Sequence, residues 1–277
     1  MAGTDEQRRH QLSEALLHPE SKGVLCARGG YGGTRLLESW QWPQKQAAHW
    51  PTNKWLIGFS DITSLLWSLS KEGVAGVHGP VLTTLADEPQ WSIDRLFNLV
   101  EKRQVQPLQG KGWTQAHVPS QATGRLLPGN LCVATHLLGT AAEPDLTNII
   151  LAFEDVGEAL YRLDRMLTQW RAMGKLKQVR GIALGRFSGW EPPRPRPTLK
   201  QRAMGKLKQV RGTALGRFND WEPPKPDPTL TVEEIMRDRL SDLGIPIISD
   251  LPFGHDGENA ALPVGLPVHL DAQTGQL

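Results

Sequence analysis

Short apolar runs alternate with amphipathic segments through the first part of the chain. Each apolar run is a few residues long and is bounded by glycine or polar residues, which is typical of a buried strand. The segments between the runs have the spacing of helices. Predicted strands cover residues 23–27, 54–59 and 74–81, and predicted helices cover residues 5–17, 34–40 and 61–73. Strands that alternate with helices predict a parallel α/β sheet.

The pattern changes to a more mixed one after a polar segment, residues 104–122, that is rich in glycine and glutamine. We therefore expect an α/β domain over residues 1–105, a linker over residues 106–122 and an α+β domain over residues 123–277. In the second domain we predict strands at 124–130, 148–155 and 181–187, helices at 160–174 and 231–244, and a strand and turn pattern at 262–277.

The second domain contains an internal duplication. Residues 171–199 and 202–230 differ at five of 29 positions and are offset by 31 residues. Two copies are too few for a solenoid, which needs three or more stacked units. We interpret the pair as a tandem duplication within one gene, and a functional repeat is the alternative.

Composition excludes several classes of protein. The chain has 277 residues, of which 39% are hydrophobic and 22% charged, as in soluble globular proteins. A net charge of only +2 argues against a nucleic-acid binder. Two cysteines, Cys26 and Cys132, are too few for a disulfide scaffold and fit a reducing compartment. No apolar run is long enough for a membrane helix, and the N-terminus lacks the apolar region of a secretory signal, so we expect a cytoplasmic protein.

The first segment with candidate chemistry is IGFSDIT, residues 57–63, where a strand runs into Ser60 and a helix follows. This arrangement puts a hydroxyl at the carboxyl end of a strand, beside helix N–H groups that can stabilise an oxyanion. A nucleophile elbow has the same strand–turn–helix order, although Ile62 stands where G-x-S-x-G has its second glycine. The alternative is that Ser60 or Asp61 is only a helix N-cap.

The second segment is the glycine-rich RGGYGG, residues 28–33. It matches neither the P-loop nor the dinucleotide-binding pattern. Its glycines allow the backbone to approach a ligand closely, so N–H groups near Gly30 and Tyr31 could bind an oxyanion or a carboxylate. A simple tight turn explains the same residues.

The third element is a pair of acidic residues and a distant histidine. Glu154 and Asp155 end an apolar strand, and His255 lies between glycine and aspartate in a later loop. A histidine at a strand end is a candidate general base, and a carboxylate at another strand end could orient it. A loop histidine and a turn carboxylate are the alternatives, and His78 is the rival base. No Cys/His spacing indicates zinc, so we expect no metal.

Together these segments resemble the LD-carboxypeptidases, a serine peptidase family that also includes the microcin C immunity proteins. The resemblance runs in order through nearly the whole chain, and it is carried by ARGGYGGTRLL, IGFSDIT, HGP, LAFEDVGEALYRLDRML, GRF and LPFGHDGENAALPVG.

The resemblance implies a Rossmann-like N-terminal domain plus a smaller β-rich C-terminal domain, with the site between them. It implies a catalytic triad of Ser60, Glu154 and His255, with backbone N–H groups near Gly30 and Asp61 as oxyanion donors and Tyr31 at the substrate. The implied reaction releases the terminal D-alanine of a murein tetrapeptide in cytoplasmic cell-wall recycling. It needs no cofactor, and the family suggests a homodimer. No nucleic-acid or membrane partner is expected.

Two departures from the family pattern leave alternatives open. Family members have further residues before the RGGYG segment, so we expect this chain to lack the first strands of the N-terminal domain. The duplication lies between Glu154 and His255, so an extra segment must be accommodated there. The alternatives are a microcin-type immunity hydrolase of peptidyl-nucleotides and an inactive, truncated paralogue.

Overall fold

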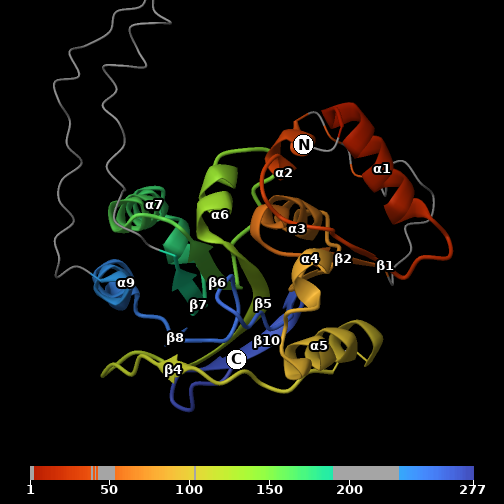
Figure 1. The fold of residues 1–277 in the computed structure, drawn as a ribbon. Coiled ribbons are helices and arrows are strands. Elements are labelled where there is room, and N and C mark those ends of the chain that lie inside the picture. Colours follow the sequence, from red (N-terminus) through yellow and green to blue (C-terminus); the bar gives the residue numbers. More distant parts are fainter. Residues whose placement is uncertain (1–2, 39, 41, 43–53, 103, 190–230) are drawn as a thin grey trace, which may run out of the picture.

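The computed structural model describes residues 3–38, 40, 42, 54–102, 104–189 and 231–277. In its first part, strands alternate with helices as predicted (Figure 1). In chain order the elements are α1 (Asp5–Leu17), β1 (Gly23–Leu25), α2 (Gly33–Leu37), β2 (Trp55–Gly58), α3 (Thr63–Lys71), β3 (Gly76–His78), α4 (Leu82–Leu85) and α5 (Gln90–Phe97).

The first sheet has the order β1-β2-β3-β9 in the described residues. Its first three strands are parallel, and β9 (Leu262–Val264) runs antiparallel to β3. Alternate residues of β2 face opposite layers: Leu56 packs in the cluster that includes α1 and α3, and Ile57 packs in the cluster that includes α5. The sheet is therefore buried on both faces at β2, as is typical of parallel sheets.

The second sheet has the order β10-β5-β6-β7-β8-β4 in the described residues. Strands β5 to β8 are parallel, and β10 and β4 pair antiparallel at the two edges. The strands are β4 (Lys111–Gly112), β5 (Gln121–Asn130), β6 (Ile149–Val156), β7 (Gly181–Ser188), β8 (Ile247–Ser249) and β10 (Pro267–Asp271). Residues 106–122, predicted as a linker, thus supply β4 and the start of β5.

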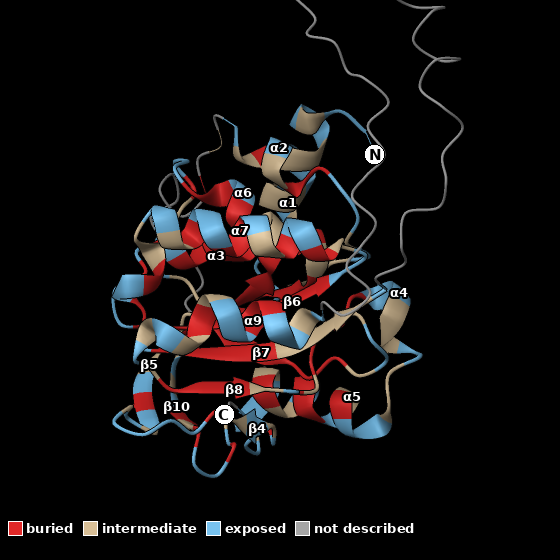
Figure 2. Ribbon diagram, turned by 90° about the vertical axis from the view of Figure 1, so that its left-hand side faces the viewer, coloured by how far each residue is buried: buried red, intermediate tan, exposed pale blue. Residues whose placement is uncertain are grey.

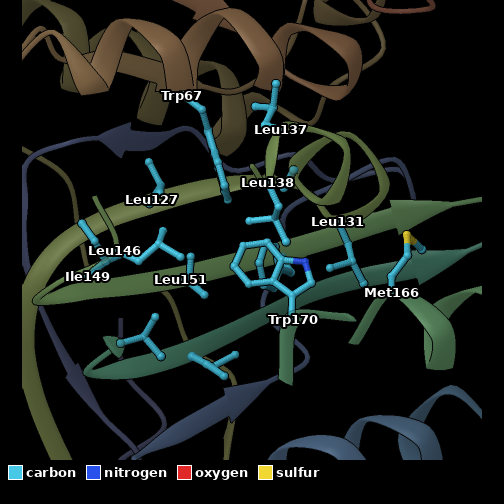
Figure 3. Packing of buried hydrophobic residues seen from close by; sticks show 14 of the residues in the cluster. Trp67, Leu127, Leu131, Leu137, Leu138, Leu146, Ile149, Leu151, Met166 and Trp170 are labelled. Atoms are coloured by element: carbon cyan, nitrogen blue, oxygen red, sulfur yellow. The ribbon is translucent and has the colours of Figure 1, made fainter. Parts of the chain in front are cut away.

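Helix α3 connects the two sheets. It packs beside α6 (Leu131–Leu137), which in turn packs beside α7 (Leu160–Ala172), and Figure 2 shows the buried faces of these helices directed toward the strands. The indole N–H of Trp67 in α3 donates to the Pro128 carbonyl of β5 at 2.8 Å. The ring of Trp67 also packs against that of Phe153. It packs against the ring of Trp170 as well, and Figure 3 shows both tryptophans among the buried residues of this cluster. This aromatic contact fixes α3, and with it the preceding turn, against the second sheet.

Only part of the duplicated sequence lies in the described residues. Residues 171–189 of the first copy form the end of α7, a short 3₁₀ turn (Lys175–Gln178) and β7. The rest of that copy and all of the second copy lie outside the described residues. Strand β7 pairs with β6 on one side and β8 on the other, so the first copy occupies the centre of the sheet. Helix α9 (Val232–Leu240) resumes the chain and packs on α7, beginning with a capping box between Thr231 and Glu234.

Candidate active site

Ser60 lies at a sharp turn between strand and helix. Strand β2 ends at Gly58, and a 3₁₀ turn, Ser60–Ile62, leads directly into α3. The backbone φ of Ser60 is +63°, in the left-handed region that residues other than glycine rarely adopt. Such a conformation costs about 1–3 kcal/mol and is often found at functional sites. It is the backbone geometry of a nucleophile elbow.

The glycine-rich loop lies against this turn. A methyl group at Gly29 would come within 2.8 Å of the Ser60 Cβ and 3.1 Å of its Oγ, so only glycine fits there. Gly30 and Gly32 have φ angles of +108° and +104°, which L side chains rarely adopt. Tyr31, between them, is 71% exposed. The loop therefore brings the Gly29 backbone, next to Gly30, against the Ser60 turn, while the Tyr31 side chain is largely exposed to solvent.

Asp61 connects the loop to the turn. Its buried carboxylate accepts a hydrogen bond from the backbone N–H of Gly33 at 2.7 Å. Burial raises the pKa of this carboxyl, and the Gly33 hydrogen bond partly opposes that rise. The Asp61 side chain is thus engaged within the protein, which leaves its backbone N–H as the group that could face a substrate.

Glu154 and His255 are in direct contact. His255 Nδ1 and Glu154 Oε2 are 2.6 Å apart, and the side chains are 18% and 0% exposed. Gly254, with φ of +121°, packs against Glu154 so closely that a methyl group there would lie 3.0 Å from Oε2. Burying a carboxylate is costly unless it is paired, and the imidazole supplies the partner.

The ring of Phe59 brings the Ser60 turn to this pair. It lies 4.7 Å from the His255 imidazole, centroid to centroid, and Ser60 is the next residue along the chain. Among the described residues no hydrogen bond joins Ser60 to His255. Catalytic hydrogen bonds often form only when substrate binds. The structure therefore places the predicted serine, histidine and glutamate in one region between the two sheets.

Comparison with known proteins identifies the family. The model of the LD-carboxypeptidase N-terminal domain matches residues 1–79, and that of the C-terminal domain matches residues 123–203 and again 196–270. This chain belongs to the LD-carboxypeptidase family. The two C-terminal matches divide within the duplicated region, so each takes in one copy.

Relatives and solved structures agree with this assignment. The chain is 50% identical to a Synechocystis sp. protein with a provisional carboxypeptidase name, slr1534, over 100% of this chain and 79% of the relative. It is 30% identical to the murein tetrapeptide carboxypeptidase of Pseudomonas aeruginosa, over 96% of this chain and 77% of the relative. The muramoyltetrapeptide carboxypeptidase of Oxalobacter formigenes has a TM-score of 0.74 at 28% identity, over 100% of this chain and 84% of that one. These findings confirm the two-domain α/β fold of the LD-carboxypeptidase family.

Asn259 is a residue of this candidate site that the sequence did not predict. Its side-chain oxygen accepts from the Gly254 N–H at 3.1 Å, and its backbone N–H donates to Glu88 at 2.9 Å. Its carbonyl also accepts from the Ser92 hydroxyl at 3.0 Å. These bonds fix the His255 loop to the segment around α5. The only signal in the sequence is an asparagine in a glycine-containing loop, which a surface turn would show as well.

Asp155, the neighbour of Glu154, faces the other way. Its carboxylate accepts from the Asn130 side chain and the Cys132 N–H, both at 2.9 Å, at the start of α6. Burial raises its pKa to about 6 despite these bonds. Successive side chains of a strand point to opposite faces, so only one of the two carboxylates can reach His255. Glu154 is that carboxylate, and Asp155 anchors α6.

His78, the rival base, is 0% exposed. Its imidazole lies edge-on to the rings of Phe59 and Phe253, with centroids 6.1 and 6.0 Å away. Burial lowers its pKa to about 4. A side chain enclosed in this way does not reach substrate, so the structure does not support His78 as the base.

The lowered pKa of His78 predicts a pH-dependent stability. Between pH 6.5 and 4 the unfolded chain binds a proton at His78 that the folded protein does not, so stability falls as the pH falls through this window. We expect the wild type to lose up to about 1.4 kcal/mol of unfolding free energy per pH unit relative to His78→Phe. Urea unfolding of both proteins from pH 7 to pH 4 measures this difference. Asp155 titrates in both proteins, so its contribution to the difference cancels. The prediction is contradicted if the unfolding free energies of the two proteins change in parallel with pH.

The described residues contain no group of three His, Cys, Asp or Glu side chains arranged to hold a metal ion. Within the same residues, no helix has the length and apolar character needed to cross a membrane.

Proposed function

We propose that this protein is a serine LD-carboxypeptidase that removes the terminal D-alanine of murein tetrapeptides. In this proposal Ser60 is the nucleophile, His255 the general base and Glu154 the residue that orients His255. The single observation that carries it is the buried Glu154–His255 hydrogen bond beside the strained Ser60 turn. Family membership supports peptidase chemistry at this place.

The geometry supports acyl transfer in two steps. The Ser60 hydroxyl attacks the scissile carbonyl carbon while His255 Nε2 takes its proton, and Glu154 holds the Nδ1–H of the imidazole. Backbone N–H groups near Gly30 and Asp61 bind the resulting oxyanion. His255 then gives the proton to the leaving nitrogen, and D-alanine departs. Water, deprotonated by His255, releases the tripeptide from Ser60.

The backbone donors have a defined energetic role in this scheme. An oxyanion donor is worth about 2.7–4 kcal/mol in the transition state, because it is aimed in advance at the developing charge. The close packing of Gly29 on Ser60 supports a position for the neighbouring Gly30 N–H near the tetrahedral oxygen. Asp61, which follows the nucleophile at the start of the 3₁₀ turn, corresponds to the donor position of a nucleophile elbow.

The proposed substrate follows from the relatives. Two relatives, at 30% and 28% identity, are named as acting on murein tetrapeptide or murein peptide, as is the Oxalobacter formigenes structure. The microcin C7 self-immunity protein MccF, solved with glutamyl sulfamoyl guanosine, has a TM-score of 0.68 at 18% identity, which shows a common fold. An immunity hydrolase is therefore a competing outcome of the assay.

The deciding experiment incubates the purified protein with L-Ala-γ-D-Glu-meso-diaminopimelyl-D-Ala and follows the products by mass spectrometry. We expect tripeptide and free D-alanine in equal amounts. A matched tetrapeptide that ends in L-alanine is the stereochemical control and should stay intact. If the protein releases no D-alanine from the tetrapeptide but cleaves an aminoacyl sulfamoyl adenosine, the immunity function replaces the proposal.

A further inference from the structure

Strand β7 contains one residue more than β6 over the same stretch of sheet. Leu184 pairs with Phe153 and Phe187 pairs with Asp155, so the register shifts between these two pairs. The additional residue falls at Gly185–Arg186. Bulges of this kind redirect side chains and are frequent beside active sites.

The bulge changes the face on which Arg186 lies. Leu184 and Phe187 both pack with the core cluster under α6 and α7. Strict alternation would put Arg186 on that side as well. Gly185 faces the opposite side, where a methyl group would meet the Phe253 carbonyl at 2.5 Å. With the extra residue, Gly185 and Arg186 both lie on this opposite face.

That opposite face is the one that carries the proposed catalytic pair. Glu154 lies there in contact with Gly254, while Phe153, its neighbour in β6, packs in the core. The Arg186 N–H donates to the Phe253 carbonyl at 2.9 Å, two residues before His255. Arg186 is therefore attached to the backbone segment that presents His255.

The charge of Arg186 has no partner among the described residues. Its side chain is half-buried, and its Nε atom is buried without a hydrogen bond. Two other half-buried arginines have carboxylate partners, Arg171 with Asp242 and Arg239 with Asp164, and the buried Arg95 donates to the Ala261 carbonyl. Holding a cation away from water without an anion is costly. An anionic ligand would remove that cost.

We propose that Arg186 binds the terminal carboxylate of the residue that the enzyme releases. The inference rests on the proposed function and names the residue that recognises the free C-terminus of the substrate. A guanidinium matches a carboxylate with two parallel hydrogen bonds. The terminal carboxylate belongs to the residue whose nitrogen takes part in the bond that is cut. In the proposed mechanism His255 protonates that nitrogen. A group that binds the carboxylate must therefore lie beside the His255 segment, as Arg186 does.

The test compares the tetrapeptide with its C-terminal amide, which lacks the negative charge. For Arg186→Gln we expect KM for the tetrapeptide to rise about 10- to 100-fold with kcat nearly unchanged, since a charged hydrogen bond made in ground and transition states is lost. Cleavage of the amide should not change, so the preference for the free acid collapses. Arg186→Lys should restore part of it.

A matched control exists within the chain. Arg217 occupies the same position of the second sequence copy, so Arg217→Gln changes the same residue type in the same local sequence. An effect at Arg217 with none at Arg186 overturns the assignment, as does an Arg186→Gln enzyme that keeps the wild-type preference. If wild type cleaves neither substrate, the proposed function fails and this inference fails with it. The thermal unfolding midpoint of Arg186→Gln should not fall, because an unpaired charge has been removed.

Discussion

Ser60→Ala should abolish D-alanine release, lowering kcat by a factor of about 10⁴ or more, because no other group can form the acyl-enzyme. The fold should survive, since the change removes one half-buried hydroxyl at a turn that α3 and β2 hold in place. The measurement is single-turnover release of D-alanine, with the thermal unfolding midpoint as the check on folding.

The control for this variant is Ser64→Ala, one turn further along α3. The Ser64 hydroxyl donates to the Asp61 carbonyl at 2.7 Å and is buried, so its loss should lower stability by about 1 kcal/mol and leave catalysis nearly intact. A Ser60→Ala enzyme that retains wild-type turnover would remove Ser60 from the mechanism, whatever the behaviour of Ser64→Ala.

Glu154→Gln should lower kcat by a factor on the order of 10⁴ with little change in KM, because an amide in this position no longer fixes the tautomer that His255 needs. The substitution preserves the size of the side chain, which packs closely against Gly254. Steady-state kinetics on the tetrapeptide measure the effect, and tripeptide binding by calorimetry tests whether the site is intact.

Asp155→Asn is the matched control for Glu154→Gln. It changes the adjacent carboxylate, which bonds to Asn130 and Cys132 rather than to His255. We expect it to lower stability through the loss of an acceptor at the start of α6, with kcat within a few-fold of wild type. Equal losses of kcat in both variants would mean that Glu154 only stabilises the fold and does not orient His255 for catalysis.

The sequence predicted the local surroundings of Ser60 well, because a strand, a turn and a helix that follow one another are encoded in adjacent residues. Only the family resemblance favoured Glu154; the local pattern could not choose between Glu154 and Asp155, because that choice depends on which face of the sheet each residue meets. Nor could it exclude His78, whose enclosure comes from Phe59 and Phe253, far apart in the chain.

Arg186 and Asn259 lay beyond the reach of local patterns for a similar reason. The bulge at Arg186 exists only through the pairing of β7 with β6, and the role of Asn259 depends on Glu88, 171 residues away. The contribution of β9 to the first sheet is also a long-range event, since its partner β3 lies in the other half of the chain. Such contacts depend on the assembled fold.

The late position of β9 and the His255 loop has a consequence during synthesis. A ribosome that has completed β1, β2 and β3 has made the Ser60 turn, but the strand that pairs with β3 and the His255 loop beside the turn are still to come. Contacts of such long sequence separation form slowly and after local structure. On the mechanism proposed above, hydrolytic competence therefore arises only after the His255 loop has been translated and has packed beside the Ser60 turn.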